Sequence, residues 1–314
     1  MRFWVGVTDN AWYRFLRDRH ERRPLDDVNF WHPSGRAPFT RLPEGTPFLF
    51  KLKRPYHHVA GGGYLVKYES LPLPLAWDAF GEGNGAAGYA ELAAMIGPLR
   101  ARDDGRTPEI GCSILAEPFF LEERDWIPLG DGFQRNIVTG RTYDTAAADG
   151  AALWRAVEER RGALPIGAEM LREPRIEVGF GAPVPRRPRL GQGAFRALVT
   201  NAYARRCAIT GEHTLPVLEA AHIRGVAEGG SHNTWNGLLL RSDFHKLFDV
   251  GLVTVTPDHR IEVSGRIAEQ WFNGKAYARL HGTTLRSLPR APQDQPRPEL
   301  LQWHNENVFE KRVA

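Results

Sequence analysis

The stretch that decides the fold is VLEAAHIRGVAEGGSHNTWNGLLLRSDFHKLFDVG, residues 217–251. Residues 217–223 alternate enough to predict a strand, a loop with adjacent glycines follows, and the apolar residues 237–240 predict a second strand. Ser242 is a suitable N-cap for a helix, and Gly251 is placed to end that helix. The stretch therefore predicts a strand, a loop, a second strand and a helix.

Side chains suited to phosphodiester hydrolysis lie on these elements. His222 falls on the first strand, Asn236 at the start of the second, and His245 on the helix. Asp249 follows His245 by one helical turn, so the two share a helix face. A neutral imidazole on a strand suits a base that deprotonates water, and an asparagine amide can brace the loop and orient that base. An imidazole and a carboxylate from one helix turn suit a divalent cation with open positions.

At these residues the chain resembles the HNH (ββα-metal) nuclease family. The matching segments are AAHIRGVAEGG and NGLLLRSDFHKLFD, with a separation of nine residues from Asn236 to His245. The resemblance implies that His222 is the general base, that Asn236 is the structural asparagine and that His245 is a metal ligand. It also implies one divalent metal ion, Mg²⁺ or Mn²⁺, in each active site.

The sequence departs from the family at one position. Many members carry an acid directly before the base, where it binds the metal, and this chain has Ala221. Asp249 is our candidate for the replacement ligand, and Glu219 is a weaker one because it sits further back on the strand. A lone histidine is usually an ordinary core or surface residue, and we expect this of His213, His232 and His259.

Composition excludes several classes of protein. A chain of 314 residues, at a prior of about 150 residues per domain, predicts two domains. Hydrophobic residues make up 42% and charged residues 25%, which excludes collagen-like, coiled-coil and wholly disordered chains. No apolar run approaches the ~18 residues of a membrane span. The start, MRFWVGVTDNAWYRFLRDR, carries charge where a signal peptide needs an apolar run.

The two cysteines also favour a cytoplasmic protein. With only Cys112 and Cys207, the chain has neither a disulfide framework nor the paired Cys-x-x-Cys knuckles that many HNH proteins use for structural zinc. We therefore expect a cytoplasmic protein without structural zinc.

Arginine is concentrated before the HNH-like stretch. Residues 183–210 contain six arginines and no acid, within a chain whose net charge is +4. Such a run is usually a solvated face or a linker, but it leads directly into the nuclease-like stretch and so favours nucleic acid as a partner. The candidate DNA-binding residues of the whole chain are Arg186, Arg187, Arg189, Arg196, Arg224 and Arg241.

The first part of the chain predicts strands and turns with a few helices. Strands are expected at residues 3–7, 46–52, 64–68, 110–115 and 119–121, and helices at 10–19 and 145–161. A Pro/Gly/Arg-rich segment, residues 179–193, marks a boundary, and a helix at 194–205 opens the second domain. We expect a first domain over 1–160, a linker over 161–190 and a nuclease domain over 191–314.

The first domain also resembles a known group. The segments VGVTDNAWYRFL, VNFWHP, FLFKL, VAGGGYL, LPLAWDAFG and FQRNIVTGRTYD are similar to bacterial proteins in which a PUA-like reader, of the SRA or EVE type, precedes an HNH nuclease. The resemblance implies an α+β chain with an N-terminal mixed β-barrel and a C-terminal ββα-metal domain. It also implies a restriction endonuclease that flips 5-methyl- or 5-hydroxymethylcytosine out of double-stranded DNA and cuts nearby.

A flipped base must be stacked on aromatic faces and hydrogen-bonded along its polar edge. We expect Trp31, in the turn-like VNFWHP segment, to be the stacking residue, with Phe30 and Asn29 beside it. Asp9 is a candidate for contacts with the polar edge. Core packing is the better expectation for three tryptophans in predicted strands or helices: Trp4, Trp12 and Trp77.

Two other functions remain open at this stage. The missing acid at Ala221 suits a modified-DNA-binding protein that has lost nuclease activity, and the HNH motif alone also suits an unspecific nuclease. One HNH site cuts one strand, so a double-strand break needs two sites and favours a homodimer. The helix at 194–205 and the segment 300–309 offer apolar residues for its interface.

Overall fold

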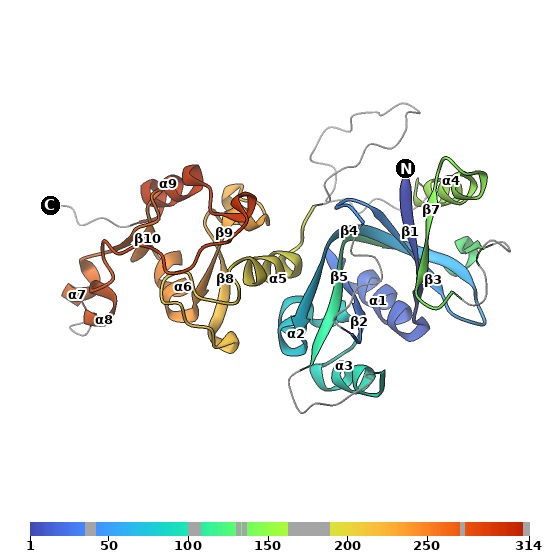
Figure 1. Ribbon diagram of the computed structural model, residues 1–314, viewed down its shortest axis with the longest axis horizontal. Coiled ribbons are helices and arrows are strands. Elements are labelled where there is room, and N and C mark those ends of the chain that lie inside the picture. Colours follow the sequence, from blue (N-terminus) through green and yellow to red (C-terminus); the bar gives the residue numbers. More distant parts are fainter. Residues whose placement is uncertain are drawn as a thin grey trace. The chain divides into compact units, whose positions relative to one another are not determined.

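The computed structural model describes residues 1–34, 42–99, 108–129, 133, 137–162, 189–270 and 274–309. The chain divides into two compact units, Met1–Arg189 and Leu190–Ala314 (Figure 1). Most of the expected linker, with Arg186 and Arg187, lies outside the described residues. Among the described residues, no helix is both long enough and apolar enough to cross a membrane.

The N-terminal unit is built on a mixed sheet. Its strands are β1 (Arg2–Thr8), β2 (Asp27–His32), β3 (Pro47–Leu52), β4 (His58–Pro72), β5 (Glu109–Phe120), β6 (Ile127–Pro128) and β7 (Gly140–Asp144). The order is β2-β5-β4-β3-β1-β7, with β6 paired to β4. Of these pairs, β1 and β3 run parallel and the others antiparallel. The mixed sheet agrees with the α+β expectation.

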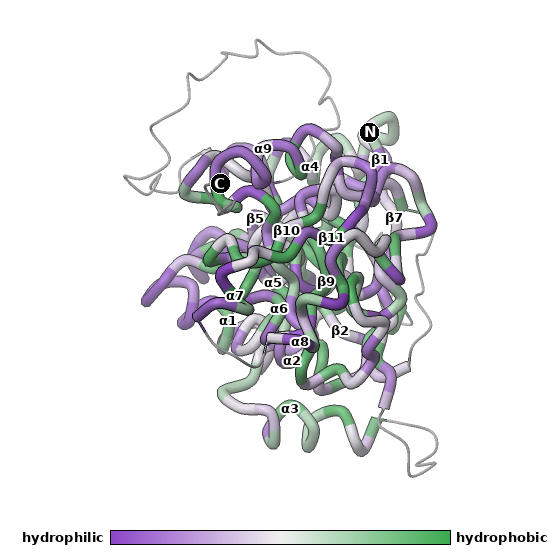
Figure 2. Tube along the Cα trace, turned by 90° about the vertical axis from the view of Figure 1, so that its left-hand side faces the viewer, coloured by the Kyte–Doolittle hydropathy of each residue, from purple (hydrophilic) through white to green (hydrophobic). Residues whose placement is uncertain are grey.

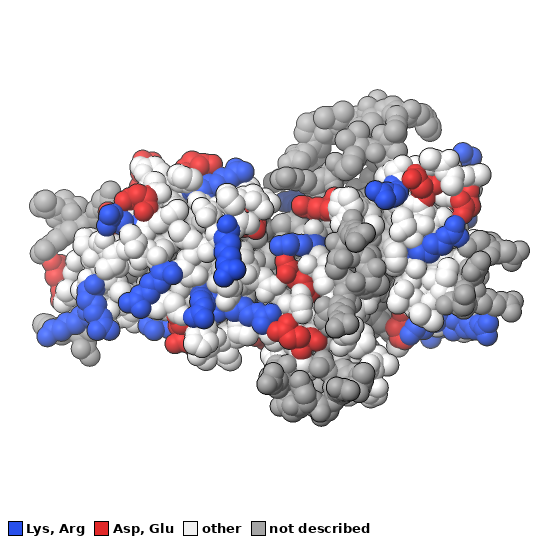
Figure 3. All heavy atoms as spheres, viewed as in Figure 1, with Lys and Arg blue, Asp and Glu red and all other residues white. Residues whose placement is uncertain are grey.

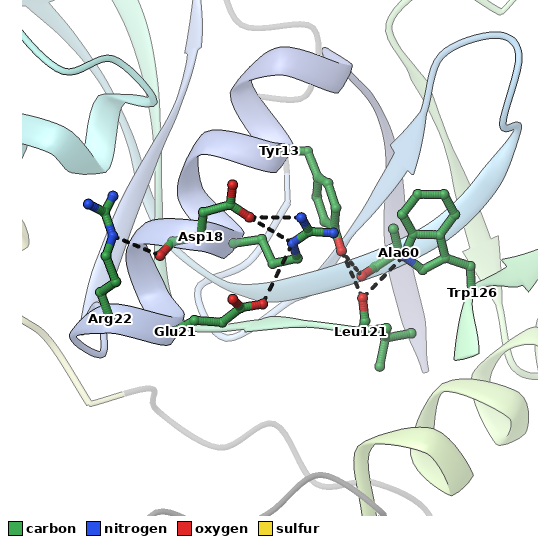
Figure 4. Close-up of polar contacts among 8 residues, drawn as sticks. Tyr13, Asp18, Glu21, Arg22, Ala60, Leu121 and Trp126 are labelled. Atoms are coloured by element: carbon green, nitrogen blue, oxygen red, sulfur yellow. Dashed lines mark hydrogen bonds and ion pairs between the residues drawn. The ribbon is translucent and has the colours of Figure 1, made fainter. Parts of the chain in front are cut away.

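Three helices pack against this sheet, α1 (Asn10–Arg22), α2 (Leu73–Phe80) and α4 (Ala148–Gly162), and α3 (Tyr89–Ile96) packs on α2. The 3₁₀ turn η1 (Gly81–Asn84) follows α2. Asp9 caps α1 because its carboxylate accepts hydrogen bonds from the backbone N–H groups of Ala11 and Trp12. The Tyr13 hydroxyl then donates to the carbonyls of Ala60 and Leu121, at 2.8 and 3.1 Å, which fixes α1 to the sheet (Figure 4). Figure 1 shows α4 beside β7.

Aromatic side chains fill the core of the N-terminal unit. Phe30 lies 4.8 Å from Phe48 between ring centroids, and Trp12 meets Phe30 and Phe50 edge-on at 5.4 and 5.3 Å. Each such ring buries about 150–250 Å², so the cluster supplies much of the unit's apolar burial. In Figure 2 hydrophobic colouring runs along strands, β5 among them.

Three sequence-based expectations about this unit are wrong. VNFWHP forms most of the strand β2 and is not a turn. The strand expected at 64–68 is part of the longer β4, which already includes the glycines of GGG, and the two strands expected at 110–115 and 119–121 are one strand, β5. A Cβ on Gly61 would lie 2.3 Å from the Phe119 carbonyl oxygen, so glycine is what allows β4 and β5 to pair there.

The C-terminal unit contains the predicted strand, loop, strand and helix. These are β8 (Leu218–His222), β9 (Gly237–Arg241) and α6 (Ser242–Asp249), with α5 (Gln192–Ala202) before them. The remaining elements are β10 (Val253–Val255), β11 (Ile261–Val263), α7 (Arg266–Gln270), α8 (Lys275–Ala278) and α9 (Pro298–Asn307). β8 and β9 form an antiparallel pair in which His222 is opposite Gly237.

Local packing explains how α5 and α6 are held. A Cβ on Gly237 would lie 2.6 Å from Val199 and 3.0 Å from Phe195, so glycine lets α5 pack directly on β9. Gly251 has a φ of 71°, and its N–H bonds the Phe248 carbonyl while the Leu252 N–H bonds that of Leu247. This is a Schellman motif, and it ends α6 as expected. The N-cap position falls on Arg241 and not on Ser242, with no side-chain capping bond.

Candidate active site

Asn236 holds the loop between β8 and β9 closed. Its side chain is fully buried, its Oδ1 accepts from the Arg224 N–H at 3.0 Å, and its Nδ2 donates to the carbonyls of Arg224 and Ser231 at 2.9 and 2.8 Å. Gly230 permits the same closure, since a Cβ there would lie 1.9 Å from the Arg224 oxygen. The amide therefore fastens both ends of the loop beside the end of β8.

His222 is the last residue of β8, and its ring is fixed on two sides. It stacks on Phe195 with ring centroids 3.9 Å apart and planes inclined by 10°. Its Nε2 lies 3.0 Å from Nδ1 of His232. Burial, followed by the charges of His232 and His245, lowers the pKa of His222 to about 4. His222 is therefore neutral near pH 7, as a general base must be.

His245 on α6 lies between two carboxylates. Its Nδ1 is 2.6 Å from Oε2 of Glu219 on β8, and its Nε2 is 3.4 Å from Oδ2 of Asp249 one turn along α6. Burial raises the pKa of Asp249 above its ordinary value; the nearby His245 acts against this rise, and the Glu219 carboxylate adds to it. Two carboxylates thus lie against a single imidazole in this site.

This donor set fits a divalent cation. When His245 donates its Nδ1–H to Glu219, its Nε2 lone pair is left on the side of Asp249, as in carboxylate–histidine–metal arrangements. A separation of 3.4 Å between Nε2 and Oδ2 suits two ligands that each lie about 2.1 Å from one ion. No group of three or more His, Cys, Asp and Glu in the described residues has the spacing of a metal site, so water and phosphate oxygens would complete the shell.

The position before the base carries no ligand. Ala221 is fully buried within the hydrophobic core of the C-terminal unit. Carboxylates reach the site instead from Glu219 and Asp249, the two replacements that the sequence suggested.

The candidate DNA-binding arginines differ in their surroundings. Arg224, near the base, donates to the Glu228 carbonyl and lies over the Trp303 ring at 5.1 Å. The Arg241 fork is held by both oxygens of Asp243, each at 2.7 Å, which offsets its charge. Arg196 is half-buried on α5, and Arg189 is exposed. Figure 3 shows Lys and Arg side chains on both units, with acidic side chains among them.

The structure separates the residues expected to form the base pocket. Asn29 is fully buried, and its Nδ2 donates to Oδ1 of Asn84 at 2.9 Å. Trp31 is half-buried, and its indole N–H donates to the Asn84 carbonyl at 3.0 Å. Phe30 belongs to the aromatic core, while Asp9 caps α1 and pairs with Lys53 at 3.0 Å. Asn84 therefore joins Asn29 to Trp31.

The sequence did not predict the roles of two residues at these sites, His232 and Asn84. His232 was expected to be ordinary, yet it contacts His222. Its position directly after Ser231, within the loop that Asn236 closes, was the available signal. Asn84 carries no such signal, because η1 meets β2 only through the tertiary fold.

Comparison with known families identifies the C-terminal unit. Residues 207–256, which contain His222, Asn236, His245 and Asp249, match the family model described as "HNH endonuclease". The chain therefore carries an HNH endonuclease domain, and it belongs to the class of metal-dependent phosphodiester hydrolases.

The chain is also similar to a solved "Modification dependent TagI restriction endonuclease". The match covers 92% of this chain and 78% of that one, with 13% sequence identity and a TM-score of 0.28. A TM-score this low supports no statement about activity. None of the curated proteins matches the chain.

Proposed function

We propose that the protein is a modification-dependent restriction endonuclease. Its N-terminal unit, as a PUA-like barrel of the SRA or EVE type, takes 5-methyl- or 5-hydroxymethylcytosine out of double-stranded DNA, and its HNH domain cuts nearby. The observation that carries the hydrolytic half is a neutral His222 close to a His245 flanked by carboxylates. The reader half is supported by the resemblance of the first domain and by the surroundings of Trp31.

Each side chain of the nuclease site has a distinct task in this proposal. His222 accepts a proton from the attacking water, and Asn236 keeps the loop beside it closed. His245 and Asp249 hold Mg²⁺ or Mn²⁺, and Glu219 orients His245. When bound, the cation offsets charge on the phosphate and the leaving oxygen.

For the reader, the proposed pocket centres on Asn29 and Trp31. They are two residues apart on β2 and so share one face of the strand, whereas Phe30 faces the aromatic core. The Asn29 Oδ1 is buried and has no hydrogen-bond partner among the described residues. An unused amide acceptor beside an indole suits cytosine, whose exocyclic amine is a donor. Asp9, engaged by Lys53, stays outside this pair.

We also propose that the protein is cytoplasmic. We propose further that it is a homodimer, because a double-strand break needs two HNH sites. The apolar residues of α5 do not serve this interface, since Phe195 and Val199 are buried in the core of their own unit. The half-buried Trp303 and Phe309 in and after α9 remain the candidates.

Plasmid digestion tests the proposed function. One plasmid is prepared with and without cytosine methylation and incubated with Mg²⁺, with Mn²⁺ or with a chelator. We expect cleavage of the methylated form only, and only with metal. Equal cleavage of both forms would show an unspecific nuclease, and binding of methylated DNA without any cleavage would show a reader that has lost activity.

A further inference from the structure

His222 has a second histidine as its neighbour. The Nε2 of His222 lies 3.0 Å from Nδ1 of His232, and the rings meet edge-on with centroids 5.0 Å apart. Two nitrogens at this distance share one proton, so one ring donates and the other accepts. The Nδ1 of His222 has no hydrogen-bond partner among the described residues.

The surrounding structure holds this pair in place. Asn236 binds the Ser231 carbonyl at 2.8 Å and thereby fixes the backbone directly before His232. Phe195 stacks on the His222 ring and also contacts the His232 ring, at 5.8 Å between centroids. His232 is half-exposed, so it exchanges protons with water.

The direction of the shared hydrogen bond decides whether His222 can act. If His232 donated, the proton of neutral His222 would sit on Nδ1, and neither nitrogen would be left to accept one from water. If His222 donates from Nε2, its Nδ1 carries a lone pair. Of the two arrangements, only the second leaves a base.

We propose that His232 is a positioning residue and proton acceptor for His222. It holds His222 in the tautomer with a bare Nδ1, and it takes the Nε2 proton of His222 as Nδ1 becomes protonated. The inference rests on the proposed role of His222 as general base. It assigns to the loop between β8 and β9 a part in the chemistry besides its part in the fold.

The proton balance of this step is simple. The attacking water gives a proton to Nδ1 of His222, and the electron pair of that O–H bond forms the new bond to phosphorus. The bond from phosphorus to the leaving oxygen breaks, and the leaving oxygen keeps that electron pair and takes a proton from water. His222 passes its Nε2 proton to Nδ1 of His232, which gives up a proton to water. Both rings end neutral, and exchange with water restores the starting tautomers.

Charges around the pair favour this transfer. Two histidines face His222, His232 in direct contact and His245 at longer range, and both disfavour a lasting charge on it. When the proton moves on to the half-exposed His232, it leaves the ring of His222, where burial and neighbouring charge disfavour it. The burial of His222 acts in the same direction.

Two substitutions separate positioning from proton transfer. His232→Asn keeps an oxygen near the place of Nδ1 but cannot carry a proton, and His232→Ala removes both functions. The matched control is His213→Asn, an exposed histidine outside the site. Single-turnover cleavage is measured for each protein against pH and against the concentration of imidazole buffer, with a thermal melt to confirm folding.

We expect His232→Ala to lose on the order of 10²-fold in rate and to be partly rescued by imidazole. His232→Asn should be slowed less and should accelerate with buffer concentration, because buffer then takes the proton. The parent and His213→Asn should not respond to buffer. Parent-like rates in His232→Asn without buffer dependence would overturn the inference, whatever His232→Ala does. Activity in His222→Ala would instead overturn the proposed base.

Discussion

At the scale of single residues, the proposed hydrolytic role falls on groups whose surroundings set their protonation. His222 is kept neutral by burial and by neighbouring histidines, and His245 is oriented by the Glu219 carboxylate. Glu219 and His232, which contribute to these effects, lie within the HNH stretch itself, whereas Phe195, which stacks on His222, comes from α5. The HNH stretch contains the groups proposed to react, and the residues packed around them set their protonation and orientation.

His222→Ala should lower the cleavage rate by more than ~10²-fold and leave binding to modified DNA intact, because no other side chain takes the place of the base.

The pH profile of the parent protein tests the role of His222 independently. Only neutral His222 is a base, so activity is lost as pH falls through its folded pKa of about 4. With saturating metal, the rate should therefore stay flat through about pH 6.5, where an ordinary histidine is half-protonated. A half-maximal rate near that pH would contradict the assignment.

Trp31→Ala should weaken discrimination between modified and unmodified DNA more than total affinity. Loss of one stacking partner costs about 1–3 kcal/mol, while the basic surface still supplies salt-dependent binding. Trp31→Phe is the matched control, since it keeps an aromatic face without the indole N–H. Titration of labelled duplexes with and without 5-methylcytosine measures both quantities. Unchanged discrimination in Trp31→Ala would place the pocket elsewhere.

At the scale of elements, the HNH segment was predictable because its order depends on local spacing. The pattern of residues 217–251 predicted β8, β9 and α6, and Gly251 ends α6 through bonds to the last turn. The elements that were missed depend on long-range packing. β5 continues past residue 115 because the glycines of β4 let the two strands approach, which the alternation of β5 alone does not reveal.

α9 brings a buried histidine under α6, and this makes the stability of the C-terminal unit depend on pH. His304 stacks on Phe248 at 3.7 Å and is bonded to the Thr254 hydroxyl at 2.8 Å. Burial lowers the pKa of His304 to about 4. Between that value and about 6.5 the unfolded chain binds more protons than the folded one, so this contribution is present above about pH 6.5 and lost as pH falls.

The expected loss from His304 is about 2 kcal/mol between roughly pH 7 and pH 5. Amide hydrogen exchange in α6 and α9 at the two pH values measures it locally. His304→Gln should remove about half of the dependence, because the amide does not titrate while His222, whose pKa is lowered to a similar value, still does. An unchanged dependence in His304→Gln would assign the effect to other groups.

At the scale of the whole molecule, the sequence predicted an N-terminal mixed β-barrel and a C-terminal HNH domain. The structure confirms an N-terminal mixed sheet, and the family comparison confirms the HNH region. Less of the proposed reader pocket could be predicted from the sequence. Asn29 and Trp31 meet through Asn84, which lies 53 residues beyond Trp31 in the chain. Contacts of this kind follow from the tertiary fold and leave no local pattern.

The proposed homodimer leads to a separate prediction. Light scattering at micromolar protein should give twice the mass of the 35.3 kDa chain, with or without DNA. Trp303→Ala, in α9, should weaken the association more than Trp77→Ala in the N-terminal unit. A strictly monomeric protein that makes concerted double-strand cuts would rule the dimer out.

The most direct test of the whole account is single-turnover cleavage of two duplexes that differ by one methyl group. Both have the same sequence and saturating Mg²⁺, and one carries 5-methylcytosine at a single site. The account predicts that the methylated duplex is cut on the order of 10-fold faster or more, the ratio that corresponds to about 1.4 kcal/mol. It also predicts that His222→Ala cuts neither duplex. Equal rates on the two duplexes would contradict the account, even with the HNH chemistry intact.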